Sequence, residues 1–214
     1  MVDRRTYLAS AGTALAAATA GCGFILGTEP ATFSASASQV PDSVLEETGY
    51  EFEKNEEMEI EKEFSAAGQT RKVVATNVLA KHEKTIDLGL LGEQRGAVFT
   101  ALTTPQVEVL DKTFNPVKEM NAKKLAKMVQ DSYSGFSNIQ QQSQSQVAIN
   151  GNTTKQVKFS ADAALSGSPV EIYLHVSEAV ELGSDFLLTF GSYPRGNSEE
   201  EANILNMMQA VEQA

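Results

Sequence analysis

The residues best suited to acid–base chemistry are few and widely separated in this sequence. Only two histidines occur, His82 and His175, and neither belongs to an H-E-x-x-H sequence or to another spacing of metal ligands. Glu171, Tyr173 and His175 alternate along a predicted strand, so their side chains share one face. This trio is the best candidate for a binding face, although ordinary solvated strand residues are the simpler interpretation. We predict no catalytic residues, no metal site and no cofactor.

Two classes of function remain open. A non-enzymatic surface domain that binds a protein or a small ligand fits the lack of a catalytic set. The alternative is an uncharacterised extracytoplasmic hydrolase, which would need His175 or His82 beside a serine and a carboxylate in a pocket. If both histidines lie on open sheet faces more than about 6 Å from any serine or cysteine, general-base catalysis loses its basis.

A row of glutamates, Glu57, Glu59, Glu61 and Glu63, occupies alternate positions of a predicted strand. Carboxylates can bind cations, but a calcium loop needs oxygens that converge from a turn, and no EF-hand loop sequence occurs. We therefore interpret the row as a solvated strand face.

Cys22 is the only cysteine, so the chain can form neither an internal disulfide nor a metal–thiolate cluster of its own. The residues before it, Thr19, Ala20 and Gly21, are small and resemble a lipobox, although Leu is usual where Thr19 stands. In a lipobox the cysteine thiol becomes the attachment point of a lipid. A buried or incidental cysteine is the alternative interpretation.

Paired arginines precede an uncharged run from Tyr7 to Gly21, which is the layout of an export signal. Arg4, Arg5, Tyr7 and Leu8 resemble the twin-arginine (Tat) export motif. The run is only mildly apolar and shorter than the roughly 20 strongly apolar residues of a spanning helix. We predict three parts: a Tat-type lipoprotein signal peptide over 1–21, a lipidated Cys22 with a flexible tether over 22–39, and a single domain over 40–214. The second half of the tether alternates weakly at Phe33, Ala35 and Ala37, so a first strand there is the alternative. The domain would be exported and held by lipid on the outer face of the cytoplasmic membrane.

The chain is acidic, with 28 Asp and Glu against 17 Lys and Arg and a net charge of −11. Such a surface disfavours nucleic acid and anionic lipid headgroups as partners, because both require basic side chains. It suits a protein that works at high salt, where charge repulsion is screened. Together with the leader, it suggests a halophilic archaeal source.

Hydrophobic periodicity predicts alternating blocks of strands and helices. The expected strands are 50–64 with Met58, Ile60 and Phe64 facing the core, 71–84, 97–102, 156–165, 169–178 and 184–193. The expected helices are 41–49, 122–133 with Asn121 as its cap, and a last helix from 197 or 198 to about 213. The polar segment 137–146 is expected to be a mobile loop.

This order predicts an α+β fold, an antiparallel sheet of about six to eight strands with helices packed on it. Both long helices are expected to cover the face of Val170, Ile172, Leu174 and Val176, which leaves the Glu171, Tyr173 and His175 face open.

Several short sequences resemble the landmarks of a haloarchaeal family of Tat-exported lipoproteins of unknown function. They are Thr48-Gly49-Tyr50, Thr103-Thr104-Pro105-Gln106-Val107, Phe114-Asn115-Pro116, Tyr173-Leu174-His175-Val176 and Gly191-Ser192-Tyr193-Pro194-Arg195. The element order is also similar to the PsbP-like fold, which occurs in accessory proteins of membrane complexes and in some lipoproteins. These resemblances imply a membrane-anchored accessory or binding protein and name no active site.

Overall fold

The protein is described by a computed structural model over residues 30–66, 69–87, 89, 92–109, 112–113, 116–132, 136–165 and 168–214. The predicted export residues, the predicted lipobox and Cys22 lie outside the described residues. Export and lipidation therefore stay predictions.

Strands make up most of the described chain. The strands are β1 (Ala31–Ser34), β2 (Ser38–Gln39), β3 (Glu51–Ala66), β4 (Gln69–Asp87), β5 (Glu93–Pro105), β6 (Glu108–Val109), β7 (Lys112–Thr113), β8 (Ser137–Ile149), β9 (Asn152–Leu165), β10 (Ser168–Ser177), β11 (Val180–Leu182), β12 (Asp185–Pro194) and β13 (Glu212–Gln213). The helices are α2 (Asp42–Thr48), the short 3₁₀ helix η2 (Pro116–Glu119), α3 (Ala122–Ser132) and α4 (Glu200–Ala210).

In the described part of the chain, the main sheet has nine strands in the order β1-β4-β5-β12-β10-β9-β8, with β3 paired to β4 and β11 paired to β12. The sheet is mixed rather than purely antiparallel, because β1 runs parallel to β4. The chain passes through α2 and β3 between these two strands, so no tight turn imposes an antiparallel direction on them.

The second half of the expected tether is ordered. Ala31 is buried and Phe33 is partly buried in a small cluster with Val73 and Val107, so this side of β1 packs against the rest of the protein. β2 pairs with β13 next to the end of the chain. Residues 31–34 and 38–39, in the second half of the predicted tether, therefore form strands, which is the alternative that the weak apolar alternation left open.

The segment expected to be a mobile loop is the strand β8. Its residues up to Gln146 are exposed or partly exposed, and only Val147 and Ile149 near its end are buried. Because β8 lies at the sheet edge, its backbone groups pair with β9 while most of its side chains remain in water. A strand that is solvated on both faces needs no apolar alternation, and the sequence pattern therefore missed it.

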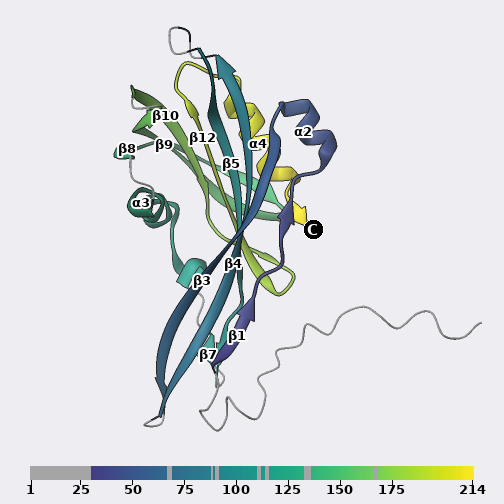
Figure 1. Ribbon diagram of the computed structural model, residues 1–214, viewed down its shortest axis with the longest axis vertical. Helices are drawn as coiled ribbons and strands as arrows, with labels where there is room; N and C mark the ends of the chain where they lie inside the picture. Colours follow the sequence, from purple (N-terminus) through teal and green to yellow (C-terminus); the bar gives the residue numbers. More distant parts are fainter. Residues whose placement is uncertain are drawn as a thin grey trace, which may run out of the picture.

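The strand β3 was correctly predicted, but its apolar residues do not face a core. Met58 is 41% exposed and Ile60 is 40% exposed, while the side chain of Phe64 is not among those described. Among the described strands, β3 is an edge strand that is bonded only to β4. Figure 1 shows that the lower half of the β3–β4 hairpin extends beyond α2, α3 and α4, so no helix covers it there.

The two long helices cover opposite faces of the sheet (Figure 1). We call the sides the α3 face and the α4 face. On the α3 face, Leu125 of α3 packs with Phe159, Leu174 and Val176, as predicted. On the α4 face, Ile204 and its helix pack with Phe99, Tyr193 and neighbouring residues. The prediction that both helices share one face is therefore wrong for α4.

The helix ends follow local signals. Gly49 ends α2 with a φ of 71°, a left-handed conformation that glycine adopts at low cost. Asn121 caps α3, because its Oδ1 accepts a hydrogen bond from the Lys124 amide at 3.0 Å. No helix in the described ranges is long and apolar enough to span a membrane.

Candidate binding surface

The three residues predicted to form a binding face lie on β10, and their exposure to solvent decreases along the strand from Glu171 to His175. Glu171 is exposed and its Oε2 lies 3.2 Å from Arg195 Nη1. Tyr173 is partly buried, and Lys158 Nζ lies 3.9 Å from the centroid of its ring. His175 is 0% exposed. The expected open face is therefore wrong at His175, because β10 passes beneath the core that α4 completes.

His175 is held by hydrogen bonds on both ring nitrogens. Nδ1 lies 2.7 Å from Gln156 Nε2, and Nε2 lies 3.2 Å from the hydroxyl of Tyr193. An amide nitrogen only donates, so Nδ1 accepts and the proton resides on Nε2. Burial lowers the pKa of His175 to about 4, because desolvation disfavours the imidazolium. The ring is therefore neutral at neutral pH.

His82 is also a core residue. It is 1% exposed, and its ring lies between Phe52 and Phe99, with centroid distances of 5.6 Å and 5.9 Å. Burial lowers its pKa, as it does for His175. Its Nδ1 has no hydrogen-bond partner within the described chain.

The geometry gives little basis for a hydrolase that uses either histidine. Our test assumed that the histidines lie on open faces, whereas both are buried. The two ring nitrogens of His175 bind an amide and a phenol, neither of which is an activated nucleophile. Within the described residues, no group of three or more metal-ligating side chains is arranged to hold a metal ion.

A buried charge cluster fixes α4 to the sheet. Glu200, which is 0% exposed, accepts a hydrogen bond from the Tyr50 hydroxyl at 3.0 Å and pairs with Lys84 Nζ at 2.5 Å. The pKa of Tyr50 is raised, first by burial and then by the negative charge of Glu200. The hydroxyl and the ammonium satisfy both carboxylate oxygens, so the cluster has a structural role.

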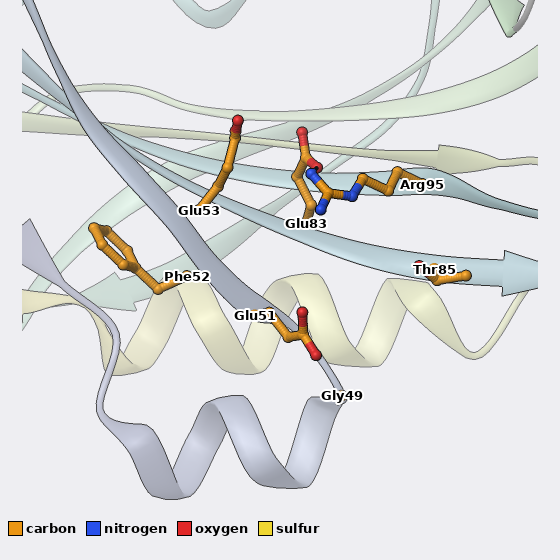
Figure 2. Close-up of a pocket in the computed structure, with 7 residues that line it drawn as sticks. All are labelled: Gly49, Glu51, Phe52, Glu53, Glu83, Thr85 and Arg95. Atoms are coloured by element: carbon orange, nitrogen blue, oxygen red, sulfur yellow. Dashed lines mark hydrogen bonds and ion pairs between the residues drawn. The ribbon is translucent and has the colours of Figure 1, made fainter.

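A small hollow of about 160 Å³ lies at the start of β3. It is lined by Gly49, Glu51, Phe52, Glu53, Glu83, Thr85 and Arg95. Figure 2 shows Arg95 against Glu83, where Nη1 and Oε2 are 2.8 Å apart, and Phe52 on the other side of the β3 ribbon. The hollow is smaller than the roughly 300 Å³ of typical small-molecule sites, so it does not indicate an enclosed ligand pocket.

A further candidate is β3 itself, which combines exposed apolar and acidic side chains. Among the described residues, the large hydrophobic side chains that are exposed are Phe52 (51%), Met58 (41%) and Ile60 (40%), and all three belong to this strand. The predicted solvated row of Glu57, Glu59, Glu61 and Glu63 is indeed exposed. We name the exposed residues of β3 from Glu51 to Glu63 the β3 surface.

Cross-strand ion pairs join β3 to β4. Lys72 Nζ lies 2.8 Å from Glu61, and Lys81 Nζ lies 2.5 Å from Glu56. The hydrogen bond and charge of Lys81 lower the pKa of Glu56, and Lys54 adds to this effect. Lys84 instead pairs with Glu200 of α4.

Sequence reasoning missed Phe52 and the edge position of β3. The apolar residues of β3 alternate in sequence in the way that core residues do, so the pattern alone gave no sign that they are exposed. The unusual density of glutamate was the available signal, because an edge strand is commonly protected by charge.

Comparisons with known proteins place the chain in a family without assigning it an activity. No curated protein matches the chain. The solution structure of cyanobacterial PsbP (CyanoP) from Synechocystis sp. PCC 6803 is similar at 10% sequence identity and a TM-score of 0.36, covering 84% of this chain and 93% of that one. At this TM-score the likeness supports no transfer of a site or an activity. The family model described as "Domain of unknown function (DUF6517)" matches residues 37–212, and the chain therefore belongs to the DUF6517 family.

Proposed function

We propose that this protein is a non-catalytic binding domain, exported and held by lipid at Cys22 on the outer face of the cytoplasmic membrane. The observation that carries the binding role is the position of the exposed apolar side chains Phe52, Met58 and Ile60, which all lie on the edge strand β3. Native edge strands are normally protected against pairing, so apolar residues exposed there favour a surface that a partner covers.

The proposed location depends on the leader. Arg4 and Arg5 stand before an uncharged run, and Thr19 to Gly21 stand directly before Cys22. A twin-arginine signal delivers a folded protein, and a lipobox would leave the lipid on the first residue of the mature chain. The domain would then face the medium outside the cell.

The hydrolase alternative has less support, because each histidine is buried and the hydrogen-bond partners of His175 are Gln156 and Tyr193 rather than a serine. A general base must lie within hydrogen-bond reach of the proton that it removes. The buried rings instead contribute to packing within the sheet.

The variant Cys22→Ser tests the anchor. We expect the protein to leave the membrane fraction and to retain its leader, because the attachment and processing residue is gone. Membrane fractionation with intact-mass measurement checks both effects, and Thr28→Ser serves as a control that leaves the lipobox unchanged. Unchanged membrane retention and mass in Cys22→Ser would refute the anchor.

The binding role is tested in the same cells with a photo-crosslinking amino acid at position 58. We expect adducts with another protein at this position and none at the exposed position 123 of α3. Equal or absent adducts at both positions would contradict a binding role for the β3 surface.

A further inference from the structure

We propose that the outer edge of β3 pairs with an extended segment of another protein in which basic and apolar side chains alternate. This inference rests on the proposed binding function and specifies its partner.

The backbone of β3 offers an unused edge. Over Glu51–Ala66, β3 is bonded to β4 on one side, and no other strand of the described chain pairs with it. A strand of 16 residues therefore presents a long row of N–H and C=O groups to its other side. A bulge interrupts the register between Phe52 and Lys54, whereas the pairing is regular from Lys54 to Ala66. The regular part is where an added strand fits best.

The two faces of β3 differ in chemistry. Glu57, Glu59 and Glu61 point to one side, and Met58 and Ile60 point to the other. Residues opposite each other in neighbouring strands share a face, so an added strand would set every second side chain against the glutamates. The side chains in between would lie against Met58 and Ile60. A partner that satisfies both faces alternates basic and apolar residues.

β4 already sets cations against glutamates of β3 on the inner edge. Lys72 pairs with Glu61 on the glutamate face, and Lys81 pairs with Glu56, which lies on the face of Met58 and Ile60. Opposite Glu57 and Glu59, however, β4 places Val78 and Thr76, and neither glutamate forms an ion pair with another described residue. These two carboxylates lie in the regular part of the strand and are available to an outer partner.

The same charges argue against a second copy of this chain on the edge. Two antiparallel β3 strands would set glutamates either opposite glutamates or opposite the even row of β3, depending on the register. In that row Lys54 and Lys62 can meet only some of the glutamates, and the others lie opposite Glu56, Met58 or Ile60. Like charges directly opposite each other destabilise a strand pair, and a carboxylate against an apolar side chain gains nothing. The basic and apolar segment is favoured because it avoids both arrangements.

A labelled synthetic peptide of about ten residues that alternates lysine and valine is a suitable probe, since strands of that length pair fully with an edge. We expect fluorescence anisotropy to show binding to the wild-type protein. Glu57→Lys with Glu59→Lys should weaken binding by about tenfold or more, because two attractive contacts become repulsive. The same variant should gain affinity for a glutamate–valine peptide.

A matched control distinguishes peptide binding at the β3 edge from general attraction to the net charge of the protein. Glu46→Lys with Glu47→Lys makes the same change in net charge on the exposed surface of α2, and should leave peptide affinity near the wild-type value. Equal losses in the two double variants would show general attraction to an acidic protein and would overturn the inference.

Proline substitution tests the backbone pairing. Neighbouring residues of a strand point their N–H groups to opposite edges. One of the two variants Met58→Pro and Glu59→Pro therefore removes an N–H from the outer edge, and the other removes an N–H from the inner edge that pairs with β4. The outer variant should lose the peptide and keep its unfolding temperature. The inner variant should unfold at a lower temperature. If both variants bind the peptide as the wild type does, or if the free protein forms a dimer that Glu59→Pro or Met58→Pro abolishes, the inference fails.

The outcomes also distinguish this inference from the proposed function. Adducts at position 58 in cells without any binding of the lysine–valine peptide would overturn the alternating basic partner and leave the binding role intact. Peptide binding in solution without adducts in cells would instead support the edge chemistry and contradict the cellular role.

Discussion

At the residue scale, the buried polar groups of the α4 face are held in defined protonation states by their neighbours. The His175 imidazole accepts from Gln156 and donates to Tyr193, and the two rings stack with centroids 5.6 Å apart. Burial raises the pKa of Tyr193, so the phenol stays protonated beside the neutral imidazole. Both groups are then satisfied without a buried charge.

The buried His175 predicts a loss of stability in acid. Its pKa is about 4 in the folded protein, against 6.5 for an ordinary histidine. As the pH falls below the ordinary value, the unfolded chain takes up the proton first, so unfolding becomes more favourable until the folded pKa is passed. We expect the free energy of unfolding to fall by about 2 kcal/mol from this residue between about pH 7 and about pH 4.5.

Denaturant unfolding at both pH values measures this effect, and NMR of the ring protons should show no titration of His175 in the folded protein near pH 6. The variant His175→Gln should have a smaller pH dependence, although His82, whose pKa is also lowered, contributes in the same direction. A His175 ring that titrates with an ordinary pKa would show that the side chain is solvated.

At the element scale, the position of α4 depends on a close approach to β12. A Cβ added to Gly191 would lie 2.5 Å from Ile204 Cγ2 and 2.7 Å from its Cδ1. Glycine therefore allows the helix to reach the strand next to His175, which lies opposite Gly191 on β10. The buried pair of Lys84 and Glu200 then fixes the first turn of the helix.

The variant Gly191→Ala should destabilise the protein by about 1–3 kcal/mol, since the added methyl group overpacks a closed core. Combining it with Ile204→Val should recover part of the loss by removing a methyl group at the contact. Gly196→Ala is the matched control, because an added Cβ meets nothing within 4 Å there. Chemical denaturation measures the free energy of unfolding of each variant. Equal stability of Gly191→Ala and Gly196→Ala would contradict the close contact between Gly191 and Ile204.

At the scale of the whole molecule, the protein has a net charge of −11, and much of this negative charge lies on the edge strand β3. Several glutamates of β3 have no described cationic partner, so their repulsion is relieved by unfolding or by salt. The surface ion pairs of Lys72 and Lys81 compensate for only part of this charge.

We expect the unfolding temperature to rise by several degrees when sodium chloride increases from about 0.1 M to about 1 M, because the screening length falls from about 10 Å to about 3 Å. Calorimetry measures the shift. Glu57→Gln with Glu59→Gln should unfold at a higher temperature in low salt and respond less to added salt. A falling unfolding temperature would show that screened ion pairs outweigh the repulsion.

The sequence by itself determined the elements that carry local signals. The stop of α2 at Gly49, the cap of α3 at Asn121 and the strands β9, β10 and β12 are all confirmed within a few residues. Glycine in a left-handed conformation and a side-chain cap act within one turn of chain, and antiparallel strands joined by short links need no distant information. The leader motifs are also local sequence signals, and the export and lipidation that they predict are untested by the structure.

Only the tertiary structure decided which faces are covered. Alternation along a strand separates two sets of side chains, but it does not say which set a helix will cover. His175 and Tyr173 look solvated in sequence, yet hydrogen bonds with Gln156 and Tyr193 allow the histidine to be buried. Met58 and Ile60 look buried, yet they are exposed because β3 lies at an edge beyond the helices. Burial depends on contacts between segments far apart in the chain, and the period of a single segment does not contain them.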